Sequence, residues 1–169
     1  AGLVAPDGCL CDDGEPDNCN FKQGDGAVAK HDWTLEETLS AVVMQAELLL
    51  IERDADAISH FLPLFLRTSD FIETRRDTVT HRFLGGPSSN LLAPSFGGWQ
   101  LPNGGLAHAY LTGLSVTYVA ALDRLVELTK LAGDSYLEGV FKGRRDTALI
   151  GLESLYAPSG DYFVKSLDP

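Results

Sequence analysis

Apolar residues recur at helical spacing in four stretches of the chain, and the first stretch runs from Thr34 to about Arg53. Its opening residues, Thr34-Leu35-Glu36-Glu37, place a hydroxyl acceptor at the N-cap and a carboxylate three residues later, which is the capping-box arrangement. The apolar positions cover most of the helix circumference, and this predicts packing on more than one side. They include Leu35, Leu39, Val42, Val43, Met44, Ala46, Leu48, Leu49, Leu50 and Ile51.

The second stretch follows a short link at Asp54 to Asp56 and predicts a helix that reaches about Arg75. Pro63 marks the first turns of this helix or a kink within it. Its apolar residues fall on one stripe, which indicates a helix with one buried face. They are Ile58, Phe61, Leu62, Phe65 and Ile72.

The third and fourth stretches predict a second pair of helices. One runs from about Leu106 to Leu131, with Gly133 as its C-terminal stop. The other is opened by Asp134 or Ser135 and reaches about Tyr156. Because a short link joins each pair, the two helices of a pair run antiparallel. The predicted fold class is therefore all-α, built from two antiparallel helical hairpins.

The remaining segments lack a helical period. Residues 1–30 are acidic and glycine-rich and predict a loop segment ahead of a helical-hairpin domain over residues 31–169. The acidic run from Asp12 to Asn18 does not have the spacing of an EF-hand loop, so a solvated loop is favoured over a calcium site. The segment from Asp77 to Ala107 is long for a loop in a compact domain, and such loops are usually functional when ordered. Residues 160–165 predict a turn and a short strand.

The three cysteines, Cys9, Cys11 and Cys19, all lie near the start of the chain. They suit a small disulfide loop in an oxidising compartment, with one thiol left over. A zinc site would need a fourth ligand, and His31 is twelve residues further on, so we expect no metal. The chain begins at Ala1 and shows no signal peptide, which is either absent or already removed. We expect a secreted or periplasmic location, with the cytoplasm as the alternative.

Charge and hydropathy exclude two classes of partner. The net charge is −11 with only 13 Lys and Arg, and no basic run could follow a phosphate backbone or an anionic lipid surface. No apolar stretch reaches the roughly 18 residues of a spanning helix. We therefore expect neither nucleic acid nor membrane as a partner. The sequence also has no phosphate-binding loop and no Ser-His-Asp or Cys-His arrangement, so no cofactor is expected.

Five groups of residues carry a resemblance to a known family. They are His31-Asp32-Trp33 ahead of an apolar helix, the Glu52-Arg53-Asp54 link, Phe61-Leu62-Pro63, Asp70-Phe71-Ile72-Glu73 with Arg75-Arg76-Asp77, and the run from Tyr110-Leu111-Thr112-Gly113-Leu114 through Leu131-Ala132-Gly133-Asp134. With them, the stretch from His31 to Pro169 resembles part of a six-hairpin (α/α)6 toroid glycosidase of the glucosidase and debranching-enzyme kind. The family's toroid has twelve helices and this chain offers about four, so either the chain is a portion of such an enzyme or its hairpins serve another purpose. Exposed apolar sides of the inner helices would require covering by further helices or another subunit.

The hairpin geometry predicts a ligand site independently of the family. If the first and third helices form the inner pair, their N-terminal ends share one rim, made by the segment around His31-Asp32-Trp33 and by the loop from Asn90 to Tyr110. Aromatic faces beside polar groups suit sugar rings. The candidate catalytic carboxyls are Asp32, Glu36 and Glu37, and the candidate binding residues are His31, Trp33, Asn90, Ser95, Phe96, Trp99, Gln100, His108 and Tyr110.

Each candidate also has a structural interpretation. Glu37 is favoured as the capping-box carboxylate over a catalytic group, and Asp32 serves equally well as a cap or a surface acid. Phe96 and Trp99 are either a ligand platform or anchors of the loop. His108 and Tyr110, expected at the start of the third helix, are either rim contacts or cap residues.

The cluster Arg75-Arg76-Asp77 is most simply a group of charges at the end of the second helix, where cations favour the helix dipole. An ion pair that braces the following loop is the alternative. The predicted function is glycoside hydrolysis or carbohydrate binding at the rim. The alternatives are a non-catalytic helical-repeat binding module, or a portion of a longer enzyme. An enzyme requires two carboxyls about 5 to 10 Å apart that face one pocket.

Overall fold

The computed structural model describes residues 35–85, 109–164 and 166–167. Most of these residues lie in four α-helices. The helices are α2 (Leu35–Glu52), α3 (Ala55–Glu73), α4 (Thr112–Ala132) and α5 (Ser135–Glu153). The predicted all-α fold class is therefore confirmed, and so is the grouping into two pairs, because a two-residue link joins α2 to α3 and another joins α4 to α5.

The first hairpin has the boundaries that the sequence predicts, within two residues. Asp54 caps α3, since its carboxylate accepts hydrogen bonds from the backbone N–H groups of Asp56 at 2.9 Å and Ala57 at 3.2 Å. Thr34, the predicted N-cap of α2, lies outside the described residues. Pro63 lies inside α3 and not in its first turn.

The second hairpin departs from the prediction at the start of α4. The helix begins at Thr112 and not near Leu106, because Ala109–Leu111 form strand β2. Its end is as predicted, with Gly133 in the left-handed conformation at a φ of 70°. Asp134 caps α5 by accepting the N–H of Leu137 at 2.9 Å.

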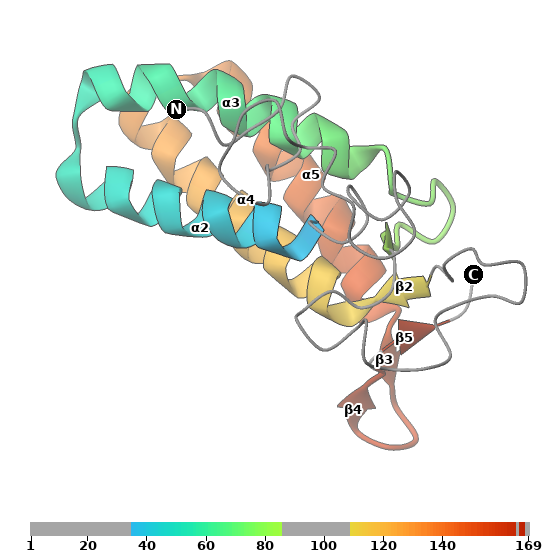
Figure 1. Cartoon of the computed structure of the whole chain (residues 1–169). Helices are drawn as coiled ribbons and strands as arrows, with labels where there is room; N and C mark the ends of the chain where they lie inside the picture. Colours follow the sequence, from blue (N-terminus) through green and yellow to red (C-terminus); the bar gives the residue numbers. More distant parts are fainter. Residues whose placement is uncertain (1–34, 86–108, 165, 168–169) are drawn as a thin grey trace, which may run out of the picture.

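The two hairpins lie side by side with α2 and α4 parallel (Figure 1). An ion pair of 2.7 Å joins Glu47 to Arg124, and each residue lies twelve positions after the first residue of its helix. Such an exposed pair adds little stability, but it joins equivalent positions of the two parallel helices. Both helices therefore begin at the same end of the bundle, here called the start end. The helix–helix links at residues 53–54 and 133–134 lie at the other end, the turn end.

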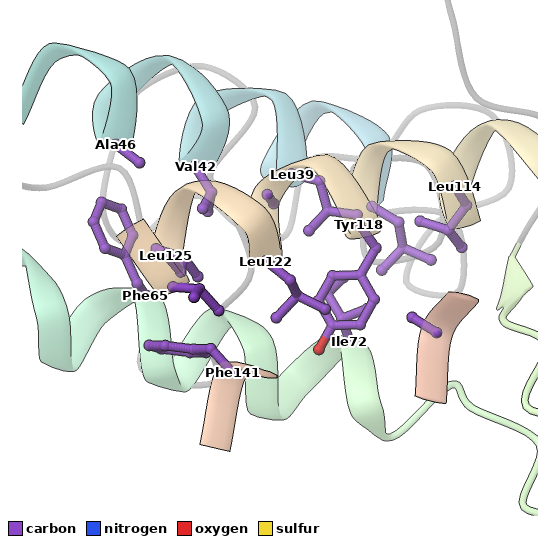
Figure 2. Packing of buried hydrophobic residues seen from close by; sticks show 14 of the residues in the cluster. Leu39, Val42, Ala46, Phe65, Ile72, Leu114, Tyr118, Leu122, Leu125 and Phe141 are labelled. Carbon is purple, nitrogen blue, oxygen red and sulfur yellow. The ribbon is translucent and has the colours of Figure 1, made fainter. Parts of the chain in front are cut away.

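Helix α4 runs antiparallel to α5 and lies at the centre of the core. The pair Arg145–Asp123 at 3.2 Å and the pair Lys130–Glu138 at 3.9 Å join the two helices. Figure 2 shows the buried side chains of α4 between those of α2 on one side and those of α3 and α5 on the other. The labelled residues are Leu39, Val42 and Ala46 of α2, Phe65 and Ile72 of α3, Leu114, Tyr118, Leu122 and Leu125 of α4, and Phe141 of α5.

Short strands gather at the start end (Figure 1). β1 (Leu84–Gly85), β2 and β5 (Ser166–Leu167) form an antiparallel sheet in the order β1-β2-β5. β3 (Tyr156–Ala157) and β4 (Tyr162–Phe163) form a separate hairpin, which is the turn and short strand predicted near residues 160–165. The fourth helix was predicted to reach Tyr156, but it ends at Glu153 because the chain enters β3.

One face of α2 is uncovered within the described part of the chain. Met44, Leu48 and Ile51 are 67%, 45% and 76% exposed, and their spacing places them on one stripe. Helix α2 packs against α3 and α4 but not against anything described on this third side. No helix within residues 35–85, 109–164 and 166–167 is long and apolar enough to cross a membrane.

A close backbone contact between α5 and the loop before β1 gives a first testable prediction. A Cβ on Gly151 would lie 2.0 Å from the carbonyl oxygen of His81, whereas a Cβ on Gly139 of the same helix meets nothing within 4 Å. We expect Gly151→Ala to lower the free energy of unfolding by about 1–3 kcal/mol through overpacking. Gly139→Ala should raise it by about 0.5–1 kcal/mol, since alanine favours helix. Urea denaturation of both variants measures the difference, and equal stability would contradict the contact.

Candidate functional site

Most of the predicted rim lies outside the described residues. This holds for His31, Asp32, Trp33, Asn90, Ser95, Phe96, Trp99, Gln100 and His108. Glu36 and Glu37 occupy the first turn of α2, at the start end. Tyr110 is the one predicted binding residue that the structure describes together with its side-chain contacts.

Tyr110 corrects a prediction, because it lies in the middle of β2 and not at the start of a helix. It pairs with Leu84 of β1 on one side and with Leu167 of β5 on the other. Ala109 and Leu111, its neighbours in the strand, are buried, and Tyr110 itself is half-buried on the opposite face. A cap interaction for Tyr110 in the third helix is therefore excluded. Its place at the start end agrees with the predicted rim.

Tyr110 contacts two charged residues of the loop between α3 and β1. Its hydroxyl donates to Oδ2 of Asp77 at 3.3 Å. The guanidinium carbon of Arg82 lies 5.8 Å from the centre of its ring, a cation–π distance. Arg82 is also held by Ser154, at 2.8 Å from Nε to Oγ and 3.1 Å from Nη2 to the carbonyl oxygen. The loop, β2 and the end of α5 are thereby joined around one aromatic ring.

Asp77 is held as an ionised carboxylate by the turn that it closes. Its Oδ1 accepts the backbone N–H groups of Thr80 at 2.6 Å and Val79 at 2.9 Å, and the Thr80 hydroxyl at 3.0 Å. These donors, with the Thr80 N–H first, lower the pKa of Asp77 below its ordinary value of 3.8. A general acid needs a raised pKa, so Asp77 is unsuited to protonate a leaving group.

Glu73, the other carboxylate near this loop, belongs to a partly buried hydrogen-bond chain. Nη1 of Arg144 donates to Oγ of Ser69 at 2.7 Å, and Oγ of Ser69 lies 2.8 Å from the Tyr118 hydroxyl. That hydroxyl donates to Oε1 of Glu73 at 2.8 Å, and Nε of Arg76 donates to Oε2 at 2.6 Å. The Tyr118 hydroxyl has a single proton, which it donates to Glu73. In the hydrogen bond between Ser69 and Tyr118, the Ser69 hydroxyl is therefore the donor.

This hydrogen-bond chain joins α3, α4 and α5 through charged and hydroxyl groups. Burial, together with the neighbouring Glu73 charge, raises the pKa of Tyr118 well above its ordinary value of 10.0. Tyr118 therefore stays a neutral donor. This hydrogen-bond chain supplies partners to polar groups that would otherwise be buried without one and destabilise the fold.

The cluster Arg75-Arg76-Asp77 lies beyond the end of α3 and not within its last turn, which contains no basic residue. Arg76 forms an ion pair with Glu73, and Asp77 closes the turn that follows. Arg76 and Asp77 are therefore held by local contacts at the start of the loop.

One groove lined by described residues lies at the turn end. It has a volume of about 310 Å³. Most of its described lining residues are apolar. Asp134, the single acidic residue among them, serves as the N-cap of α5. It therefore lacks the carboxylate pair that glycoside hydrolysis needs. The lining residues are Arg53, Ala55, Ile58, Ser59, Leu62, Leu131, Ala132 and Asp134.

The prediction from sequence missed a set of exposed aromatic residues on the β3–β4 hairpin. Tyr156, Tyr162 and Phe163 are 38%, 56% and 48% exposed, and they lie at the start end. The available signal was the segment from Tyr156 to Phe163, in which aromatic residues flank a Pro-Ser-Gly-Asp turn outside any helical stripe. Arg82, which contacts Tyr110, was not singled out because no spacing in the sequence connects them.

No group of three or more His, Cys, Asp or Glu side chains within the described ranges is arranged to hold a metal ion. Comparison of the chain with protein-family models, with curated proteins and with solved structures finds no match. Functional inference therefore depends on the geometry of the start end.

The hydrogen bonds of Asp77 predict a pH dependence of stability. Its folded-state pKa lies below the ordinary value of 3.8, so its stabilising effect is complete above that value. The effect is lost as the pH falls through the folded-state pKa. Asp77→Asn should therefore be less stable than the wild type at neutral pH, and the difference should shrink below about pH 4.

Denaturant unfolding across this pH range measures the difference. Glu153→Gln is a suitable control, since Glu153 is exposed and its side chain has no hydrogen bond or ion pair among the described residues. A pH-independent difference for Asp77→Asn would show that its charge has no stabilising role.

Proposed function

We propose that this chain is a glycoside hydrolase-like protein that acts on or binds an oligosaccharide at the start end. The observation that carries the proposal is the parallel arrangement of α2 and α4, which brings both helix N-termini to one end of the bundle. Helix N-termini carry partial positive charge and favour carboxylates and polar ligand groups. Residues far apart in sequence therefore become neighbours at this end.

The chemistry of the start end supports a sugar ligand. Glu36 and Glu37 lie in the first turn of α2, and Asp32 precedes them by only a few residues. Tyr110 offers an aromatic ring with a cation on its face and a carboxylate at its hydroxyl. Sugar rings present apolar C–H faces and many hydroxyl groups, so aromatic rings beside charged hydrogen-bonding groups match both.

We also propose that further helices or another subunit cover the bundle. The uncovered face of α2 supports this. Met44, Leu48 and Ile51 form an exposed apolar stripe along the helix. Exposed apolar stripes of this kind commonly mark interaction surfaces. The proposal fits both a portion of a six-hairpin toroid and an associated chain. A secreted or periplasmic location remains part of the proposal, as suits an extracellular polysaccharide substrate.

A non-catalytic sugar-binding module is the second candidate. It is favoured by the state of the carboxylates that the structure describes near Tyr110. Glu73 is paired with Arg76 and Tyr118, and Asp77 is held by its own turn. Both carboxylates are engaged in structural contacts, which leaves Asp32, Glu36 and Glu37 as the candidate catalytic groups, whereas binding needs no free carboxylate pair.

The two candidates predict different results with a panel of maltoheptaose, cellohexaose and xylohexaose. If the chain is an enzyme, it hydrolyses at least one of these sugars. Replacing one catalytic carboxyl then lowers the rate by about 10²–10⁴-fold while binding persists. The test variants are Asp32→Asn, Glu36→Gln and Glu37→Gln, with Asp56→Asn at the turn end as the matched control.

Product formation is measured by chromatography, and binding by calorimetry. Binding without hydrolysis would select the non-catalytic module. A chain that neither binds nor hydrolyses any sugar of the panel would overturn the proposed function. Loss of activity in Asp56→Asn equal to that in the three test variants would contradict a site at the start end.

A further inference from the structure

The β3–β4 hairpin presents aromatic rings to solvent in a fixed arrangement. Tyr156 and Phe163 are cross-strand partners, and their rings meet edge to face with centres 5.2 Å apart. The Tyr156 hydroxyl also donates to Oδ1 of Asp161, a residue of the connecting turn. Exposed aromatic side chains are usually scattered singly, whereas here they are grouped and held by contacts to one another.

Strand alternation turns the aromatic pair away from the core. Leu155, the residue before Tyr156, is almost completely buried, and its carbonyl oxygen accepts the N–H of Val164 at 3.0 Å. Since successive side chains of a strand point to opposite faces, Tyr156 and Phe163 point outward. Tyr162, on the other face, lies close over Gly160, where a Cβ would meet its ring at 1.9 Å. The turn thus needs a glycine at this position for the ring to lie there.

The hairpin is attached to the start end through the first residue of α4. The Thr112 hydroxyl donates to the carbonyl oxygen of Val164 at 2.5 Å, and Val164 directly follows Phe163. Thr112 in turn follows β2, the strand that contains Tyr110. Ser154, just before the hairpin, is held by Arg82, which covers the ring of Tyr110. The aromatic pair is therefore connected to Tyr110 of the proposed sugar site through a few contacting residues.

We propose that the β3–β4 hairpin is an additional sugar-contacting surface, on which a pyranose ring of a bound oligosaccharide stacks against Phe163 and Tyr156. This inference rests on the proposed function, and it adds a preference for longer oligosaccharides. The Asp161 carboxylate beside the rings offers an acceptor for sugar hydroxyls. An aromatic ring with an adjacent carboxylate suits a sugar better than a purely apolar partner, which would leave that charge desolvated.

Chain length provides the sharpest test. A surface beside the main site contacts a long oligosaccharide but not a short one, so Phe163→Ala should weaken binding of maltoheptaose by about three- to tenfold and leave maltose binding unchanged. Phe163→Leu keeps an apolar side chain against Tyr156 but loses the flat aromatic face. It should give the same pattern, and it keeps the test valid if the alanine variant does not fold.

Tyr136→Ala is the matched control, since Tyr136 is a 76% exposed aromatic residue at the turn end. It should bind both sugars as the wild type does. Titration calorimetry measures all affinities, and circular dichroism confirms that each variant is folded.

The possible results separate the inference from the proposed function. Unchanged maltoheptaose affinity in both Phe163 variants overturns the inference and leaves the proposed function intact. An equal loss for maltose and maltoheptaose also overturns it, because the effect would then lie in the main site. A wild-type chain that binds neither sugar overturns the hairpin surface for these glucans, and the full panel then decides the proposed function.

Discussion

The burial of α4 is the constraint on which the rest of the fold depends. This helix contributes more of the buried core than any other described helix, and it packs against α2, α3 and α5. Each buried leucine side chain removes apolar surface from water and contributes about 1.5–3 kcal/mol. Because α4 is surrounded, each of the other three helices buries part of its apolar face against it. Its buried face also contains polar residues. The hydroxyls of Ser115 and Thr129 donate to backbone carbonyl oxygens one turn earlier, and that of Tyr118 is satisfied by Ser69 and Glu73.

Helix α2 packs parallel to α4, and the candidate site depends on this arrangement. Two helix N-termini at one end create a region where polar ligand groups are favoured. The strands at this end then position Tyr110, and the turn closed by Asp77 positions Arg82 against it. The network around Glu73 and Tyr118 lies within the bundle and stabilises it, whereas Tyr110 is half-buried and the aromatic rings of the β3–β4 hairpin are exposed to solvent.

The sequence predicted the helices well because their patterns are long. Apolar residues recur at helical spacing over many turns. The structure also has Gly133 at the end of α4 and Asp134 as the cap of α5, as the sequence predicts. The predicted start of α4 was wrong because a segment of three residues, Ala109 to Leu111, is too short to distinguish a helical from a strand pattern. Leu111 forms no side-chain cap, so no local signal marks the boundary.

Contacts between distant residues could not be predicted from spacing. Arg82 reaches Ser154 across 72 positions, and Tyr118 reaches Ser69 across 49. Two-residue strands such as β1 are too short to show alternation, so their pairing depends on the helices that bring them together. The uncovered stripe of α2 is a further example. Its apolar pattern predicts that something packs against it, but the pattern does not identify the partner.

The parallel direction of α2 and α4 is tested most directly by distances between spin labels. On a cysteine-free chain, one label at Ser40 of α2 is paired with a second label at Val116 or at Leu131, both exposed on α4. Parallel helices place Ser40 nearly level with Val116, and Leu131 about 20 Å further along the axis at 1.5 Å per residue. Pulsed electron paramagnetic resonance should give the shorter distance for Ser40 and Val116. The reverse order would mean antiparallel helices and would contradict a shared site at their N-termini.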